Sequence, residues 1–236
     1  MQLTSSQIQS IQPKGLDLDF LSFKIIDLGK DGFEGESETL FKAYGLWKRI
    51  WLHTFQELEG IKNIYSDDFL RQDEAFAIFY RDECIGITMH SFVDLDNPIQ
   101  RDLKYFKAYP PGSLEAIRNK GIRHVLISNQ TAVDHEFRKS LTGMAFGDIL
   151  IGLSVRRLVE SRLDAFIAYT NNSKKVQEIC YRFGAKPIVK GHSQHNVEVD
   201  IVCLERQMAT ESSQREVNLV IDHLWSSQSQ AQGEAA

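Results

Sequence analysis

A strand, a long amphipathic helix and a second strand follow one another in the middle of the chain, and this unit constrains the fold most. The runs IRHVLIS (122–128) and LDAFIAY (163–169) are short, apolar and rich in β-branched and aromatic residues, which is typical of strands. Between them, residues 143–162 place apolar side chains at helical spacing. Such a connection is nearly always a right-handed crossover, so the sequence predicts at least one parallel pair of strands.

An antiparallel section precedes this unit. The runs AFAIFY (75–80) and CIGITMHSFVDL (84–95) flank the polar tripeptide 81–83, a pattern that indicates a hairpin. FKIIDL (23–28) predicts an earlier strand. The other predicted elements are helices over 37–59, 113–119, 172–183 and 213–225 and strands over 186–189 and 197–204.

These elements together predict the fold class. We expect an α/β (α+β) fold with a mixed, mostly antiparallel twisted sheet of about seven strands and helices on both faces. Whether Gly45 divides the helix at 37–59 into two stays open. The chain has no internal repeat and no Pro-rich linker, which favours one domain. The expected divisions are an N-terminal tail (1–21), the main domain (22–206), a C-terminal helix (207–226) and a disordered tail (227–236).

Composition narrows the classes of function. The net charge of −5 argues against a general nucleic-acid binder. No run approaches 18 apolar residues, so we expect no membrane span, and residues 1–15 lack the pattern of a secretory signal. The three cysteines are not spaced as metal ligands, so we expect no metal and reduced, buried thiols in a cytoplasmic protein.

The loop that opens the helix at residue 143 carries the first family resemblance. Residues 133–138 read Val-Asp-His-Glu-Phe-Arg, and Gly143 follows five residues later. The stretch resembles V-x-P-E-(Y/F)-R-x-x-G-x-(G/A) of the GNAT superfamily of acyltransferases. His135 replaces the proline, and Leu141 stands where the first loop glycine is expected. In an alternative register, Gly143 and Gly147 form the glycine pair.

The chemistry of this loop suits a phosphate. A helix N-terminus presents unpaired amides and a partial positive charge, which together bind anions. Arg138 and Lys139 add formal charge, Thr142 is a potential cap, and Gly143 allows close backbone approach. The predicted donor-binding residues are Ala132, Val133, Arg138, Lys139, Leu141, Thr142, Gly143, Met144, Ala145, Asn171 and Lys174.

A second resemblance lies near residue 181. GNAT helices often end in Y-x-x-x-G-F, and this chain reads Tyr181-Arg182-Phe183-Gly184-Ala185, one residue shorter and without the final aromatic residue. Lys174 stands where the family often has Asn. The resemblance implies that Tyr181 is the general acid that protonates the leaving thiolate. Packing of a half-buried tyrosine is the alternative interpretation.

The resemblance covers roughly residues 22–206 and implies N-acyl transfer from a pantetheine thioester to an amine by direct attack. The implied donor is acetyl-CoA or another acyl-CoA, and an acyl-carrier protein with a long-chain acyl group is the alternative. Residues 138–190 have a net charge of +6, which would favour either anionic donor. Candidates for the general base are His90, Glu74, Asp94, Asp134 and His135.

Several alternatives stay open. The departures in the loop also fit a non-catalytic module that binds acyl-CoA. A nucleotide-binding protein would use the same helix N-terminus, but neither GxGxxG nor GxxxxGK[ST] is present. The aromatic insertion at 96–121 either covers a substrate or packs on the sheet. The C-terminal helix, with Leu224 and Trp225, offers a surface for a second subunit in a homodimer.

Overall fold

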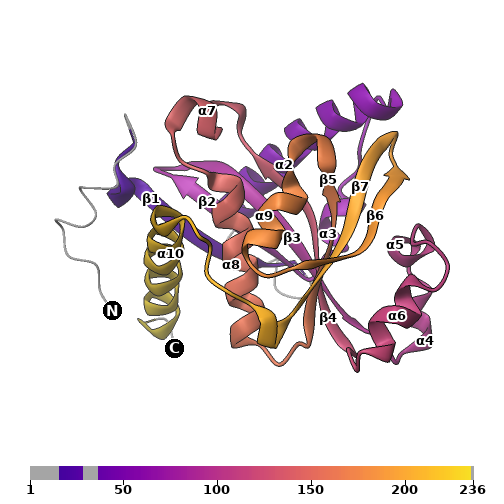
Figure 1. Ribbon diagram of the computed structural model, residues 1–236. Helices are drawn as coiled ribbons and strands as arrows, with labels where there is room; N and C mark the ends of the chain where they lie inside the picture. The colour runs from indigo at the N-terminus through magenta and orange to yellow at the C-terminus, as the bar shows by residue number, and fades with distance from the viewer. Residues whose placement is uncertain (1–15, 29–36, 235–236) are drawn as a thin grey trace.

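The computed structural model describes residues 16–28 and 37–234. In this part of the chain, seven strands form one sheet with the order β1-β2-β3-β4-β5-β7-β6. Figure 1 shows this twisted sheet with helices on both sides. The strands are β1 (Leu21–Asp27), β2 (Glu74–Tyr80), β3 (Glu83–Asp94), β4 (His124–Val133), β5 (Ala165–Asn171), β6 (Lys186–Gln194) and β7 (Val197–Glu205).

The pairing confirms the predicted mixed sheet. β4 and β5 are parallel, and every other neighbouring pair among the described strands is antiparallel. The α-helices are α2 (Ser37–Glu59), α3 (Asp67–Leu70), α4 (Pro98–Arg101), α5 (Lys104–Lys107), α6 (Ser113–Asn119), α7 (Lys139–Thr142), α8 (Phe146–Glu160), α9 (Val176–Arg182) and α10 (Arg215–Glu234). Short 3-10 helices are η1 (Leu18–Phe20), η2 (His135–Phe137), η3 (Asn172–Lys174) and η4 (Arg206–Met208).

One face of the sheet packs against α8, α9 and α10. Alternate residues of each strand point to this face, as Phe76, Leu126 and Phe166 do, and they join Leu150 of α8 and Leu224 of α10 in one buried cluster. Close packing is tightest at Gly152 of α8, where a Cβ atom would lie 2.1 Å from Ile221 Cδ1. The absence of a side chain at this position therefore lets α8 and α10 touch.

The opposite face has two separate coverings. Helix α2 lies over the β1–β4 half, where Trp47 is fully buried beside Ala77 and Met89. The insertion that contains α4, α5 and α6 covers β4, β5 and β7, and Tyr105 and Tyr109 pack against Tyr169 with ring centroids 5.1 and 5.2 Å apart. The insertion thus packs on the sheet, as one of the two interpretations predicted.

The structure answers the open question at Gly45, and several helix boundaries differ from the predicted ones. Helix α2 is continuous through Gly45, which is exposed with open space where a side chain would be. The helix predicted from residue 143 begins at Phe146, because Gly143 adopts a left-handed conformation (φ +77°). The C-terminal helix continues to Glu234, so most of the tail predicted over 227–236 is helical, and the last two residues lie outside the described part. In the predicted N-terminal tail, residues 1–15 are also outside it, whereas Leu18 is buried.

The apolar face of α10 is covered within the same chain. Trp225 stacks on Phe23 of β1, with centroids 5.9 Å apart, and Leu224 is fully buried. Figure 1 shows α10 beside β1 and α8. This face of the helix is therefore not free to bind a second subunit.

Candidate active site

The site begins where β4 and β5 separate. The two strands pair from Val125–Ser128 and from Ala165–Ala168, yet β4 continues to Val133 and β5 to Asn171. Residues 129–133 and 169–171 stay paired with β3 and β7, respectively, but not with each other, and we call these two ends the splay. In open α/β sheets, ligands bind beyond the carboxyl ends of strands at such points.

A bulge at Gln130 shapes the β4 side of the splay. The β3–β4 register shifts between Ile87 and Met89, and Gln130 has φ +49°, so one strand carries an extra residue here. Trp51 of α2 donates a hydrogen bond to the Gln130 carbonyl at 3.0 Å. Helix α2 therefore fixes the backbone at the point where β4 leaves β5.

The loop after β4 remains open to solvent at its predicted phosphate-binding residues. Arg138, Lys139 and Gly143 are exposed, and α7 is a single helical turn before α8. Thr142 Oγ1 accepts a hydrogen bond of 3.2 Å from the Met144 amide, so it caps the turn and not α8. Ala132, Met144 and Ala145 are buried, whereas Leu141 is exposed and Val133 is partly buried.

The first turn of α8 presents backbone donors. In the described ranges, the amides of Gly147 and Asp148 have no hydrogen-bond acceptor, as expected for a helix start without a side-chain cap. Asp148 is buried, and its carboxylate pairs with Arg182 and accepts a bond of 3.0 Å from the Gln214 amide. The Arg182 guanidinium therefore offsets a negative charge that would otherwise oppose an anion at this helix end.

A cavity of about 610 Å³ adjoins the loop on the α2 side. It lies between α2, the β2–β3 turn and residues 134–137. Arg49 forms an ion pair with Asp134 across it, and three further carboxylates, Asp82, Glu83 and Glu136, are in its lining. Lys42 is also in the lining, so four carboxylates face two cations and the cavity has a net negative charge.

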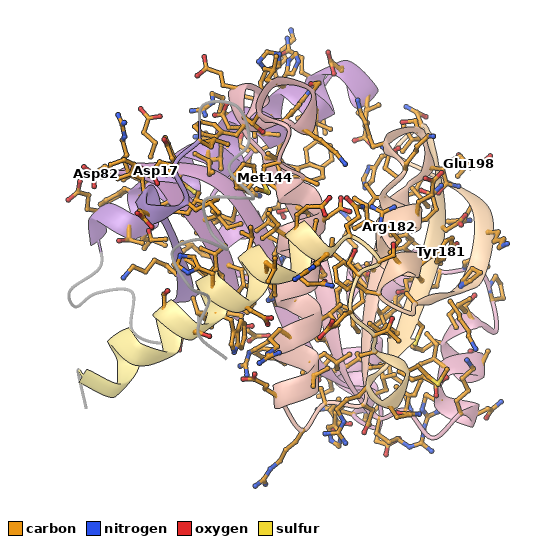
Figure 2. All side chains as sticks on the ribbon, turned by 60° about the vertical axis from the view of Figure 1, so that its left-hand side comes forward. Asp17, Asp82, Met144, Tyr181, Arg182 and Glu198 are labelled. Atoms are coloured by element: carbon orange, nitrogen blue, oxygen red, sulfur yellow. The ribbon has the colours of Figure 1, made fainter. Side chains whose placement is uncertain are left out.

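Tyr181 lies on the other side of the sheet, on α9. Its hydroxyl donates a hydrogen bond of 2.6 Å to Asp200 of β7, and Asp200 is opposite Thr170 in the β5–β7 pairing. Burial, followed by the hydrogen bond to Asp200, raises the pKa of Tyr181. Figure 2 shows Tyr181 and Arg182 near the strand that carries Glu198.

The full Y-x-x-x-G-F spacing would place the tyrosine at residue 180, which is a cysteine. Cys180 is buried, and burial raises the pKa of its thiol to about 12. A thiolate nucleophile is therefore not formed here at neutral pH. The partly exposed Tyr181 is the polar side chain that α9 presents at this turn.

The remaining predicted donor-binding residues follow β5. Asn171 caps η3 by accepting from the Lys174 amide at 3.2 Å, and the Lys174 side chain is exposed. Both lie at the splay end of β5, so the structure brings them to the same sheet edge as Arg138 and Lys139. The carboxyl ends of the two parallel strands account for this placement.

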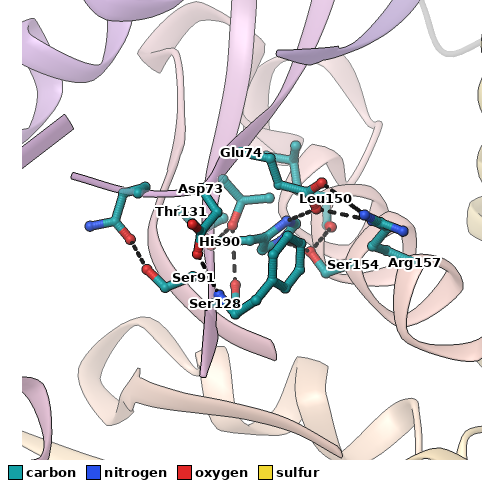
Figure 3. Close-up of polar contacts among 12 residues, drawn as sticks. Asp73, Glu74, His90, Ser91, Ser128, Thr131, Leu150, Ser154 and Arg157 are labelled. Atoms are coloured by element: carbon teal, nitrogen blue, oxygen red, sulfur yellow. Dashed lines mark hydrogen bonds and ion pairs between the residues drawn. The ribbon is translucent and has the colours of Figure 1, made fainter. Parts of the chain in front are cut away.

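Two of the predicted base candidates, His90 and Glu74, lie in a buried network away from the splay (Figure 3). His90 is fully enclosed, with Nδ1 3.1 Å from Glu74 Oε1 and Nε2 2.9 Å from Ser154 Oγ. Arg157 donates to both oxygens of Glu74. Burial lowers the pKa of His90 despite the nearby carboxylate, which favours the neutral form of the ring. Burial opposes ionisation of Glu74, but its bonds from His90 and Arg157 lower its pKa.

The other base candidates are distributed differently. Asp134 caps η2 through the Glu136 amide at 3.0 Å and pairs with Arg49, and His135 is exposed. Asp94 lies at the end of β3 beside the insertion, where it accepts from the Asp96 amide at 2.8 Å. The structure therefore brings Asp134 and His135, but not Asp94, to the splay edge.

Sequence reasoning missed Asp200. In the run VEVDIVCL, Glu198 and Asp200 alternate onto the face that Val202 and Leu204 bury, and Asp200 is the acid adjacent to these apolar residues. A buried acid in an apolar strand is the signal that would have identified it. Asp148, in the first turn of α8, is likewise a buried acid among apolar residues.

Within the described residues, no group of three or more His, Cys, Asp or Glu side chains is placed to hold a metal ion. No helix in the same part of the chain is long and apolar enough to cross a bilayer.

These features, namely the mixed seven-stranded sheet, the splay after the single parallel pair and the loop leading into α8, define the fold of GNAT acyltransferases. A scan against models of known families finds no match, and a search of curated protein sequences finds none either.

Solved structures of that fold are similar to this chain. FeeM, an N-acyl amino acid synthase from uncultured soil microbes, is 16% identical over 79% of this chain and 91% of that one, with a TM-score of 0.50. An agmatine N-acetyltransferase mutant is 10% identical over 78% and 99%, with a TM-score of 0.54. The CoA-dependent acyl-homoserine lactone synthase BjaI is 10% identical over 87% and 90%, also with a TM-score of 0.54. At these identities the similarity establishes the fold.

Proposed function

We propose that this protein is an N-acyltransferase that moves an acyl group from acyl-CoA to an amine. The observation that carries the proposal is the splay of β4 and β5, which is followed by an exposed loop and by the amides of Gly147 and Asp148, for which the described part of the chain supplies no acceptor. An extended pantetheine would lie between the two diverging strand ends, with its phosphates at the helix start. The similar fold of N-acyltransferases supports the same activity.

In this mechanism, Arg138 and Lys139 supply the formal charge near the phosphates, and Lys174 adds a third cation from the β5 side. The backbone of β4 at the Gln130 bulge faces the thioester. The protein contributes chiefly by positioning the reactants, since an amine attacks a thioester directly. Acetyl-CoA is the simplest donor, and longer acyl groups are alternatives.

The acidic cavity beside α2 is the proposed entry for the acceptor. Its carboxylates, at Asp82, Glu83 and Glu136, would attract a cation, and an amine is an ammonium ion before it reacts. Because both ring nitrogens of His90 are occupied in a closed network, we assign His90 and Glu74 a structural part in this proposal.

The test is release of free thiol from acetyl-CoA and longer acyl-CoAs in the presence of a panel of amines. We expect turnover with at least one cationic amine, such as a polyamine, and weaker turnover with amines that also carry a carboxylate. Binding of acyl-CoA without turnover on any amine would favour the non-catalytic module. Turnover with an acyl-carrier protein but not with acyl-CoA would identify the carrier protein as the donor.

A further inference from the structure

Asp200 is the most completely hydrogen-bonded carboxylate near the splay. Oδ2 accepts from the Tyr181 hydroxyl at 2.6 Å, and Oδ1 accepts from Asn172 Nδ2 and from the Gly191 amide, both at 3.0 Å. These donors come from α9, η3 and β6, respectively. Asp200 itself is 5% exposed. The carboxylate is therefore held in one position by three separate elements.

The backbone is shaped around this carboxylate. The β6–β7 register shifts between Val189 and His192, and Gly191 in this bulge has φ +64°. At this shift the Gly191 amide donates to the side chain of Asp200 and not to a backbone carbonyl of β7. Thr170 Oγ1 also donates to the Asp200 carbonyl at 3.0 Å, which joins the residue to the splay end of β5.

This arrangement changes what Tyr181 can do. A phenol that has lost its proton would leave two negative charges 2.6 Å apart, so direct donation by Tyr181 is unfavourable. A phenol that gains one proton as it gives another to the carboxylate avoids that state. Tyr181 is thus suited to relay a proton and not to supply one.

We propose that Asp200 acts through Tyr181 as the positioning residue that stores the proton during acyl transfer. This inference rests on the proposed function. The amine first releases one proton to water and attacks the thioester carbon, which forms the C–N bond and an oxyanion. The nitrogen, now positively charged, passes a proton to the Tyr181 oxygen while Tyr181 passes its own proton to Asp200.

The second half of the reaction reverses the path. The C=O bond re-forms, the C–S bond breaks, and the thiolate takes a proton from Tyr181, which recovers its proton from Asp200. Nitrogen and sulfur are bonded to the same carbon in the intermediate, so one hydroxyl can reach both. The products are the amide, the free thiol and the one proton released at the start.

Other charged groups surround the pair and must be considered in any titration. The charge of Lys190 in β6 helps to lower the pKa of Asp200. Glu198 of β7 accepts a hydrogen bond from Asn172 Nδ2, which also donates to Asp200. Cys180 and Arg182 flank Tyr181 on α9, and Arg182 is engaged by Asp148. Burial opposes ionisation of Asp200, but the bonds from Tyr181, Asn172 and Gly191 outweigh it and lower its pKa.

The test compares Asp200→Asn, which keeps the size and an acceptor oxygen, with Glu198→Gln, a control on the same strand. The pKa of Tyr181 is followed by NMR of ring-¹³C tyrosine, with Tyr181→Phe used to assign the signal. We expect Asp200→Asn to lower this pKa by at least one unit and Glu198→Gln to leave it unchanged. An unchanged pKa in Asp200→Asn would overturn the proposal.

The kinetic arm uses the same variants. We expect Asp200→Asn to reduce kcat at least tenfold with an unchanged KM for the acyl-CoA, and the double variant with Tyr181→Phe to be no slower than the slower single variant. If the reductions in kcat of the two single variants multiply in the double variant, the two residues act separately, and this would contradict the relay. If the wild type transfers no acyl group, the proposed function fails, and the relay fails with it. The NMR titration would still show whether Asp200 raises the pKa of Tyr181.

Discussion

The indole nitrogen of Trp47 lies 2.6 Å from the side-chain oxygen of Gln130, a residue whose backbone is left-handed. Trp51, one helical turn later, bonds the carbonyl of the same glutamine. Both tryptophans belong to α2, and Gln130 belongs to the β4 bulge. A helix 79 residues or more away in sequence thus fixes the end of β4 at which the proposed donor passes.

Trp47→Phe should therefore weaken the fold at this point. The change leaves the Gln130 oxygen without its buried partner, and we expect the free energy of unfolding to fall by about 1–3 kcal/mol. Urea denaturation measures this loss. In a double-mutant cycle with Gln130→Met, the combined loss should be smaller than the sum of the two single losses. Strictly additive losses would show that the hydrogen bond contributes nothing.

The buried His90–Glu74 pair predicts how stability depends on pH. The folded protein lowers the pKa of His90, so the unfolded chain binds the proton first and stability falls as the pH drops below about 6.5. Glu74 also has a lowered pKa, so its contribution is complete above about pH 4.3 and is lost at lower pH. Thermal unfolding from pH 8 to pH 4 should show the melting temperature falling from near pH 6.5 downward.

His90→Gln is the variant that separates these two effects. It removes the group that titrates near pH 6.5 and keeps a polar side chain in the network. The variant should be less stable at pH 8, and its melting temperature should change less than that of the wild type between pH 7 and pH 5. An equal change in both proteins would assign the pH dependence to other groups.

Replacing each of two helical glycines by alanine should change the stability of the protein in opposite directions. At Gly152, a Cβ would lie 2.1 Å from Ile221 Cδ1 and 2.9 Å from Phe183 Cζ, so Gly152→Ala should cost about 1–3 kcal/mol of stability through overpacking. At Gly45, nothing lies within 4 Å, so Gly45→Ala should stabilise α2 by about 0.5–1 kcal/mol. Chemical denaturation of the two variants compares them directly. Ile221→Val should recover part of the Gly152→Ala loss, and no recovery would place the clash elsewhere.

Much of the sheet follows from local pattern. The two apolar runs and the short polar turn at 81–83 predicted the β2–β3 hairpin, and the helix predicted over 113–119 is α6 (Ser113–Asn119). The end of β4 was missed, because Asn129, Gln130 and Thr131 are polar and the bulge breaks the period of two. These residues are held in the strand by β3 and α2, which are long-range partners that a local pattern does not contain.

The site was predictable to a similar extent. A helix N-terminus with basic neighbours is visible in the residues after Val133, because spacing and residue type suffice to recognise it. The partnership of Tyr181 with Asp200 joins α9 to β7 across 19 residues and depends on the β6 bulge at Gly191. That geometry arises from the pairing of three strands, so only the folded chain reveals it.

The exposed cations of the loop predict a modest, salt-dependent share of donor affinity. Arg138 and Lys139 are both solvent-exposed, so each charge acts through water and is screened. Replacing either by Gln should weaken acyl-CoA binding about threefold to fivefold in low salt, corresponding to about 1 kcal/mol or less. Arg162→Gln, at an exposed position just beyond the C-terminal end of α8, is the control. Equal weakening by all three changes would indicate a general charge effect without a local site.

The most direct measurement is a calorimetric titration of the wild-type protein with coenzyme A and, separately, with pantetheine, which lacks the phosphates. If the amides and cations between Val133 and Gly147 hold the phosphates, coenzyme A should bind with measurable heat and pantetheine at least tenfold more weakly. Equal affinities, or no binding of coenzyme A, acetyl-CoA or longer acyl-CoAs, would contradict the account.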